Sequence, residues 1–324
     1  MDLQFDEFVV RHVSSGMAAS SWCAVALAYR EHYALKWAAT SPHFHLVELQ
    51  MTQDPAIAGQ GRFGGPGQNR SLERGLEVLR AFRPGTDLLG NGELAERTGL
   101  SRATISRLTQ TLVTAGFLEH DRAARAYRLA VPVLSLGHAM RASSPVLRVA
   151  VPLMHEVSAR LKVNVGLASP DRADMIYLES IRYHRKVSLR TVVAGQRVPI
   201  ELTSLGRAYL GRLDASERQE LLASLKRAHS AAAWRPISAG INEAMAELGR
   251  SGYCWTSWQP NVIALAAPLT IACRTLALNF SQPSEEAPAQ RARVAAALAP
   301  RLLALRDRIE SGIEAHDTAA LNYA

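Results

Sequence analysis

Three residues at a fixed spacing, Ala95, Gly99 and Ile105, are typical of a helix-turn-helix. In that motif two helices cross so closely that the first needs a small residue at the contact, and a glycine four residues later lets the chain turn. An aliphatic side chain six residues further on packs the second helix against the first. The spacing predicts a short helix that follows Asn91 and a second that Ser101 caps and that ends near Gly116.

The second helix carries a polar face that is suited to reading DNA bases. With Ile105 and Leu108 turned inward, a rotation of about 100° per residue places a short polar strip on the outside. No acidic residue occurs between Ser101 and Thr114. An arginine binds guanine through two hydrogen bonds and a glutamine binds adenine, each pair giving about 1–3 kcal/mol of discrimination. The residues expected at the DNA are Ser101, Arg102, Ala103, Thr104, Ser106, Arg107 and Gln110.

A polar turn at residues 121–125 lies between two short apolar segments, 117–120 and 126–129, and predicts a hairpin. Arg122, Arg125 and Arg128 give this hairpin a positive charge that suits phosphate contact. An ordinary solvated surface would explain any one of these arginines. The combination of the helix spacing, the absent acids and the hairpin favours a winged helix-turn-helix that binds double-stranded DNA.

The rest of the chain supplies the elements that position this module. Leu72, Leu76 and Leu79 lie on one face of a helix that ends near Arg83. A bridging helix is expected at 131–141. Beyond it, helices at 146–161, 205–213, 214–227, 238–250 and 285–314 alternate with strands at 163–168, 175–180, 187–193, 262–269 and 275–280. The fold class is therefore α+β, with helices packed on an antiparallel or mixed sheet.

We expect five segments along the chain. These are an extension at 1–69, the winged domain at 70–130, a linker helix at 131–143, a second α/β domain at 144–314 and a flexible tail at 315–324. Within the extension, translation is hypothesised to begin at Met51, and Gly59 to Gly64 match G-x-G-x-x-G only by chance, since neither a strand nor a helix flanks them.

Composition excludes several classes of protein. The chain has 324 residues, a formal charge of +8, 48% hydrophobic residues and three cysteines without a C-x-x-C pair. A disulfide scaffold and a thiolate zinc module are therefore excluded. No run of eighteen apolar residues is present, so no membrane span is expected, and a reducing, cytoplasmic location is the simplest interpretation.

Several segments together resemble the IclR family of bacterial transcriptional regulators. In the first half these are Ser71–Leu79, Glu93–Leu108 and Leu112–Glu119, and in the second half Gly195–Ile200, Thr203–Ala208 and Ala266–Leu269. The resemblance implies a winged helix-turn-helix, a linker helix and an effector-binding domain related to GAF domains. It also implies a homodimer or homotetramer on partly palindromic promoter DNA and a small organic-acid effector, with no cofactor and no metal.

Carried over to this sequence, the family's effector pocket is expected at Val198, Ser204, Leu205, Ala264, Asn279 and Ser281. Where this sequence departs from the family pattern, we add Arg190, Trp255 and Trp258 to the expected pocket. Ser204, Asn279 and Ser281 would donate hydrogen bonds, and Arg190 or His184 would provide a positive charge. Ala264 would widen the site, and the two tryptophans would provide aromatic walls. We therefore hypothesise an aromatic or otherwise bulky carboxylate. The alternative is that the tryptophans belong to the hydrophobic core and that the pocket accepts a short acid.

Two other function classes remain as alternatives. An enzyme acting on a small acid is the first, but H-E-x-x-H, C-x-x-C and G-x-S-x-G motifs are absent from the sequence. A DNA-binding architectural protein without a ligand is the second, but it leaves the second domain without a role. The sequence thus favours a ligand-responsive regulator of a catabolic operon that is not an enzyme.

Overall fold

The computed structural model describes residues 69–183, 192–259, 261–271, 274–284 and 286–321. Several expectations therefore lie outside the described residues. They are the start at Met51, the glycine-rich match at 59–64, most of the strand at 187–193, and the charges of His184 and Arg190.

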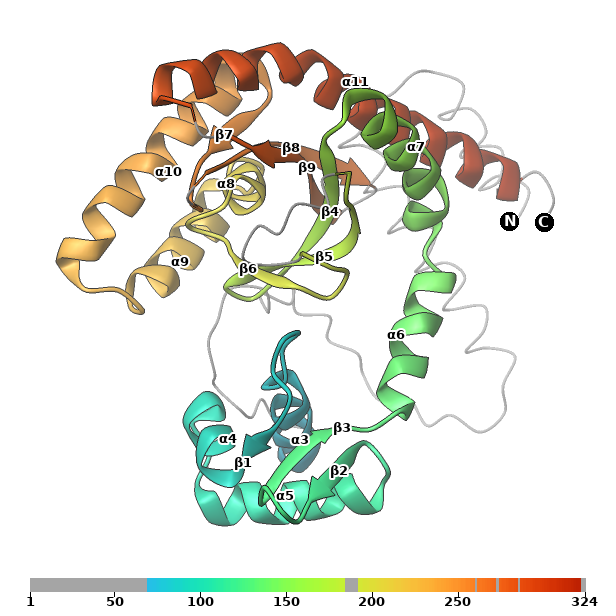
Figure 1. The fold of residues 1–324 in the computed structure, drawn as a ribbon, viewed down its shortest axis with the longest axis vertical. Coiled ribbons are helices and arrows are strands. Elements are labelled where there is room, and N and C mark those ends of the chain that lie inside the picture. The colour runs from blue at the N-terminus through green and yellow to red at the C-terminus, as the bar shows by residue number, and fades with distance from the viewer. Residues whose placement is uncertain (1–68, 184–191, 260, 272–273, 285, 322–324) are drawn as a thin grey trace, which may run out of the picture. The chain divides into compact units, whose positions relative to one another are not determined.

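A small helical module with a three-stranded sheet forms the first described part (Figure 1). Its helices are α3 (Arg70–Arg80), α4 (Asn91–Thr98) and α5 (Arg102–Thr114). Its strands are β1 (Leu89–Gly90), β2 (Leu118–Asp121) and β3 (Ala126–Leu129). They lie in the order β1-β3-β2 with antiparallel pairing, which is the arrangement of a winged helix-turn-helix. The expected hairpin is present, and β1 is an additional strand.

The core of this module joins all three helices. Val78, Leu94 and Ile105 are completely buried. On α3 the structure departs from the expected apolar face, because Leu72 and Leu76 are 61% and 50% exposed. The helix instead turns Val78 and the following Ala81 and Phe82 toward its neighbours.

Two helices continue the chain, α6 (Pro132–Ala142) and α7 (Pro145–Leu161). The Ser144 hydroxyl accepts a hydrogen bond from the Leu147 amide, and Pro145 occupies the first helical position, where its missing N–H costs nothing. No residue of α6 is buried, whereas α7 packs along the large sheet.

A six-stranded sheet forms the centre of the second part (Figure 1). Its strands are β4 (Asn164–Asp171), β5 (Asp174–Ile181), β6 (Arg197–Pro199), β7 (Cys254–Thr256), β8 (Val262–Ile271) and β9 (Arg274–Pro283). They lie in the order β6-β5-β4-β9-β8-β7. The four remaining helices are α8 (Ser204–Leu210), α9 (Ala215–Lys226), α10 (Ala231–Ser251) and α11 (Pro288–Leu321).

Alternation along β9 explains how the sheet has two different faces. Leu276, Leu278 and Phe280 point into the hydrophobic cluster that α7 and α11 complete. Ala277 points the other way, into the cluster formed with α8, α9 and α10. Helices therefore cover both faces of an antiparallel sheet, which confirms the α+β class.

Some boundaries differ from the expected ones for local reasons. Helix α10 begins at Ala231, seven residues early, because the Ser230 hydroxyl caps the Ala233 amide and the helix tolerates Pro236 in its second turn. Helix α11 continues to Leu321, into the segment expected to be a flexible tail. The short edge strands β6 and β7 are too brief to give a period of two in the sequence.

Candidate nucleic-acid interface and effector pocket

The turn between α4 and α5 forms as the glycine spacing requires. Gly99 has a φ of 70°, a left-handed conformation that favours glycine, and its amide donates to the Ala95 carbonyl at 2.9 Å. The Ser101 hydroxyl then accepts from the Thr104 amide at 3.3 Å and begins α5. On the inner side, the buried Thr109 hydroxyl donates to the Ile105 carbonyl at 2.9 Å, so it needs no other partner. These contacts fix which face of α5 is turned outward.

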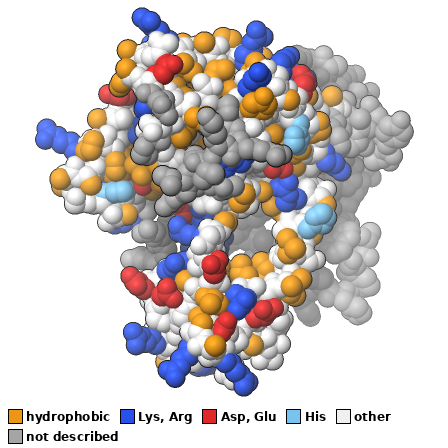
Figure 2. Space-filling model, in the orientation of Figure 1, with side chains coloured by type: hydrophobic (Ala, Val, Ile, Leu, Met, Phe, Trp, Pro, Cys, Tyr) orange, Lys and Arg blue, Asp and Glu red, His pale blue; other side chains and the backbone are white. Residues whose placement is uncertain are grey.

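The outer face of α5 matches the strip expected at DNA. All of the expected residues on this helix and at its cap are exposed except Thr104, which is half-buried; the exposed ones are Ser101, Arg102, Ala103, Ser106, Arg107 and Gln110. Figure 2 shows Lys and Arg side chains along the edge of the module over α5. The strip has the size and polarity of a groove-reading helix.

The wing arginines are not equivalent. Arg128 pairs with Asp121 at 2.6 Å. Asp121 also accepts from the Ala124 amide, and that bond together with Arg128 lowers the pKa of the Asp121 carboxyl. Within the described chain, Arg122 and Arg125 have no carboxylate partner. Arg128 therefore holds the hairpin turn, whereas Arg122 and Arg125 are available to a polyanion.

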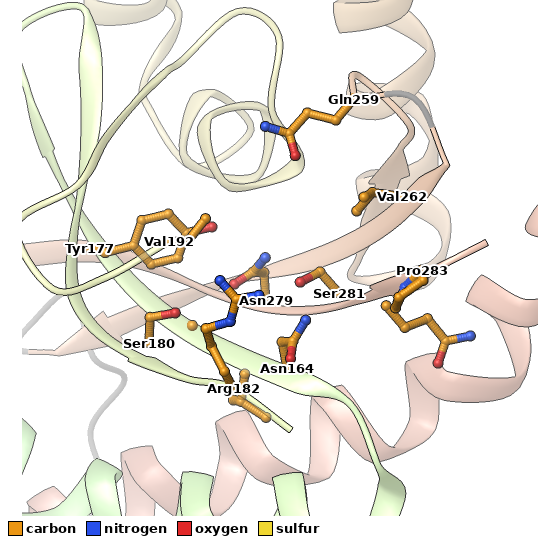
Figure 3. A pocket seen from close by; sticks show the side chains of 13 residues that line it. Asn164, Tyr177, Ser180, Arg182, Val192, Gln259, Val262, Asn279, Ser281 and Pro283 are labelled. Carbon is orange, nitrogen blue, oxygen red and sulfur yellow. The ribbon is translucent and has the colours of Figure 1, made fainter. Parts of the chain in front are cut away.

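A pocket lies on the large sheet, on the side of α8, at the ends of β4, β5 and β9 (Figure 3). Its volume is about 60 Å³. The described residues that line it are Asn164, Val165, Gly166, Tyr177, Ser180, Arg182, Val192, Gln259, Val262, Asn279, Ser281, Gln282 and Pro283. This lining combines amides and hydroxyls with one cation and contains no carboxylate, so it suits a small polar anion.

The sequence expectation located part of this pocket. Asn279 and Ser281 line it, as β9 turns its odd-numbered residues to the α8 side. Val198 and Leu205 belong to the hydrophobic cluster on that same side, but they are not among the lining residues. Ser204 is buried at the start of α8.

Trp255, Trp258 and Ala264 are outside the described lining of this pocket. Trp255 lies opposite Leu265 in the β7–β8 ladder and packs against the cluster of α7 and α11, on the other face of the sheet. Trp258 packs against the cluster of α8 and α10. Ala264 is buried next to Thr256 in the ladder. Within the described lining, Tyr177 is the aromatic residue.

Sequence reasoning missed Gly166, Tyr177, Ser180 and Arg182. A glycine inside a predicted strand often marks a close approach by other groups, and Gly166 was such a signal. The Tyr177 hydroxyl, within the apolar run 175–178 of the predicted strand, was another. Nothing in the sequence indicated that Arg182 lies at the same end of the sheet as Asn279.

The strand that carries Tyr177 and Ser180 also holds the end of α6. The Arg141 guanidinium donates to the Leu178 carbonyl and to the Glu179 carboxylate, the latter at 2.6 Å. Glu179 accepts a further hydrogen bond from the Ser180 amide at 2.8 Å. A movement of β5 at the pocket would therefore change the hydrogen bonds that Arg141 makes from the last turn of α6.

Two features are absent from the described residues. No three His, Cys, Asp or Glu side chains there are grouped so that they could hold a metal ion. Across the same ranges, no helix combines the length and the hydropathy that crossing a bilayer demands.

Comparison with solved structures supports the fold. A crystal structure of an IclR family transcriptional regulator from Brucella abortus is 32% identical, with a TM-score of 0.70 over 80% of this chain and 98% of that chain. An IclR homolog from Microbacterium hydrocarbonoxydans, solved in complex with 4-hydroxybenzoate, is 22% identical, with a TM-score of 0.56 over 76% of this chain and 99% of that chain. At that identity the second likeness concerns the fold alone.

Comparison with sequence families points to the same family as the solved structures. Residues 71–122 match the IclR helix-turn-helix domain, and residues 138–298 match the bacterial transcriptional regulator IclR C-terminal domain. The HTH-type transcriptional regulator TsaQ1/TsaQ2 of Comamonas testosteroni is 35% identical over 193 residues, which is 58% of this chain and 68% of that protein. The exposed recognition helix, the polar pocket and these matches lead to one conclusion: the chain belongs to the IclR family of transcriptional regulators.

Proposed function

We propose that this regulator reads promoter DNA with α5, contacts phosphates with its wing, and changes its DNA affinity when a small organic acid binds the pocket on the large sheet. The observation that carries the proposal is the outer face of α5, which is exposed and free of acids and is fixed in orientation by Gly99 and Ser101. Arg107 and Gln110 are the residues that we assign to base edges.

The pocket supports an anionic effector. Arg182 lies in its lining with the hydroxyls of Ser180 and Ser281, and no carboxylate among the described lining residues would repel an acid. We favour a compact aromatic carboxylate, for which a solved IclR homolog in complex with 4-hydroxybenzoate is the precedent. A volume of about 60 Å³ is smaller than the roughly 150 Å³ of a cavity that admits benzene, so an aromatic ring requires the walls to part. A short acid such as pyruvate needs no such change.

Coupling between ligand and DNA is assigned to β5 and α6. The same strand provides Tyr177 and Ser180 to the pocket and holds Arg141 through Glu179. A ligand shifts the balance between two arrangements only if its affinity for them differs. We therefore propose that the effector favours one position of β5 and that Arg141 passes the difference to α6.

We also propose that the functional form is a homodimer or a dimer of dimers. Helix α6 exposes Leu134 at 74% and Met140 at 51%, and α3 exposes Leu72 and Leu76. Exposing this many apolar side chains to water is unfavourable, and packing against a second copy of the chain would bury them. Leu134→Glu should shift the sedimentation coefficient toward a monomer, whereas Leu129→Glu, on the wing, should not. An unchanged coefficient in Leu134→Glu would remove α6 from the proposed interface.

A mobility-shift assay on the DNA upstream of the gene tests the whole proposal. We expect a specific complex that benzoate-type or pyruvate-type acids weaken or strengthen. The proposal fails at its DNA step if no specific complex forms in low salt, and at its sensing step if no acid changes the complex. We propose a sensing role and no catalytic role for the pocket, and a cytoplasmic location for the protein.

A further inference from the structure

A pair of polar side chains at the base of the pocket is packed over a glycine. Gly166 on β4 lies opposite Asn279 on β9, and a Cβ atom placed on Gly166 would be 2.4 Å from both the Asn279 Oδ1 and the Tyr177 Cε1. Tyr177 reaches this point from β5 (Figure 3). The missing side chain of Gly166 thus makes the space in which Tyr177 and Asn279 lie together.

This pair is hydrogen bonded to itself but not saturated. Burial raises the pKa of Tyr177 to about 12, and a hydrogen bond from Asn279 offsets part of that rise. A bond that favours the phenolate is one donated to the phenol oxygen, so the Asn279 amide nitrogen is the donor. Among the described residues, the Asn279 Oδ1 is buried without a hydrogen-bond partner, in a residue that is only 4% exposed.

The pair therefore presents one donor and one acceptor toward the ligand. Tyr177 stays protonated at neutral pH, and its O–H is left to donate, since the oxygen already accepts from Asn279. The Asn279 Oδ1 is left to accept. Leaving a buried acceptor without a donor is unfavourable, so the ligand group at this place must supply one.

A hydroxyl is the smallest group of an organic acid that satisfies both requirements. A carboxylate has no proton to donate and would place its negative oxygens against the Asn279 Oδ1. An ammonium donates but offers no lone pair to the Tyr177 O–H, and Arg182 in the same lining would repel it. A methyl group satisfies neither atom, whereas a hydroxyl both donates and accepts.

We propose that the effector carries a hydroxyl in addition to its carboxylate, and that this hydroxyl binds between the Tyr177 hydroxyl and the Asn279 carboxamide oxygen. The inference rests on the acid-sensing role proposed above and names the class of acid: a hydroxy acid, aromatic or aliphatic. The carboxylate is then left to Arg182 and the serine hydroxyls. A ligand that lacks the hydroxyl should bind about 5- to 150-fold more weakly, since it leaves the buried acceptor unpaired.

Isothermal titration of the full chain with two matched pairs of acids tests this inference. The first pair is 4-hydroxybenzoate and benzoate, and the second is lactate and propionate; the pair that binds identifies the aromatic or the aliphatic class. We expect the hydroxylated member to bind more tightly by at least about fivefold. Equal affinities within the pair that binds would overturn the hydroxyl inference and leave acid sensing intact. Failure of all four acids to bind would overturn both.

A variant of the same shape separates hydrogen bonding from packing. Tyr177→Phe removes the donor and keeps the ring, so it should lower the affinity ratio within the pair several-fold while the acid without a hydroxyl binds as before. The part of the ratio that remains belongs to the bond with the Asn279 Oδ1. Tyr209→Phe is the matched control, because Tyr209 is buried on α8 and is outside the described lining. A ratio that stays high in Tyr177→Phe, or that falls equally in Tyr209→Phe, would contradict the assignment.

Discussion

Replacing Arg141 by methionine should uncouple the effector from DNA while leaving each binding event in place. The guanidinium makes two hydrogen bonds to β5, at the Leu178 carbonyl and the Glu179 carboxylate. Hydrogen bonds to charged groups contribute about 1.5–3 kcal/mol each when buried. The Arg141 and Glu179 side chains are 36% and 15% exposed, so solvent screening reduces the pair, and we expect a loss of about 1–2 kcal/mol in coupling.

The assay compares the Kd for upstream DNA with and without saturating effector. A loss of 1–2 kcal/mol corresponds to about a 5- to 30-fold smaller effect of the acid on that Kd, with the affinity for the acid itself nearly unchanged. Arg160→Met is the control, because Arg160 pairs with Glu156 at 3.7 Å on the exposed surface of α7. The reasoning is refuted if Arg141→Met leaves the effect of the acid intact, or if Arg160→Met reduces it as much.

Three further predictions concern DNA, ligand and pH. Arg107→Ala should lower the affinity for the specific site far more than for random DNA, whereas Arg125→Ala should lower both and reduce the salt dependence by about one phosphate contact; binding titrations at several salt concentrations measure this. Gly166→Ala should weaken effector binding at least tenfold by calorimetry, because its Cβ collides with the hydroxyl-binding pair, yet DNA binding without effector should persist. Burial is the largest single influence on Asp171 and opposes its ionisation, but the bond and charge of Arg197 together with the charges of Arg80 and Arg172 outweigh it and lower the pKa of that carboxyl. Because the folded pKa is depressed, the charged Asp171 stabilises the fold above the ordinary aspartate pKa, and this stabilisation is lost as the pH falls through the folded pKa. Asp171→Asn removes this titration, so the melting temperature of the variant should fall less steeply as the pH is lowered.

The helix-turn-helix could be predicted from sequence because its determinants are local. Gly99 needs a left-handed turn, Ser101 caps the helix that follows, and Ile105 is buried at the predicted spacing. The outer face of α5 follows from those three facts. The buried face of α3 was predicted wrongly. Leu72 and Leu76 form a regular apolar stripe in the sequence, but they lie on the exposed side of the helix.

Within the pocket, Asn279 and Ser281 were predicted from the family resemblance and not from the strand pattern. The structure places both on the face of β9 opposite to its apolar face. Gly166 and Tyr177 come from β4 and β5, and their meeting with Asn279 depends on strand order and register. Register is a property of paired strands, and no single segment of sequence contains it.

Protection of guanine N7 atoms from dimethyl sulfate tests most directly whether α5 lies in the major groove. On the upstream DNA, the wild-type chain should protect guanines in two half-sites about one helical turn apart. Arg107→Ala, at a concentration that restores occupancy, should leave at least one of these guanines in each half-site open to methylation. Guanines that remain unprotected under the wild-type protein, or a pattern that Arg107→Ala does not change, would contradict the account.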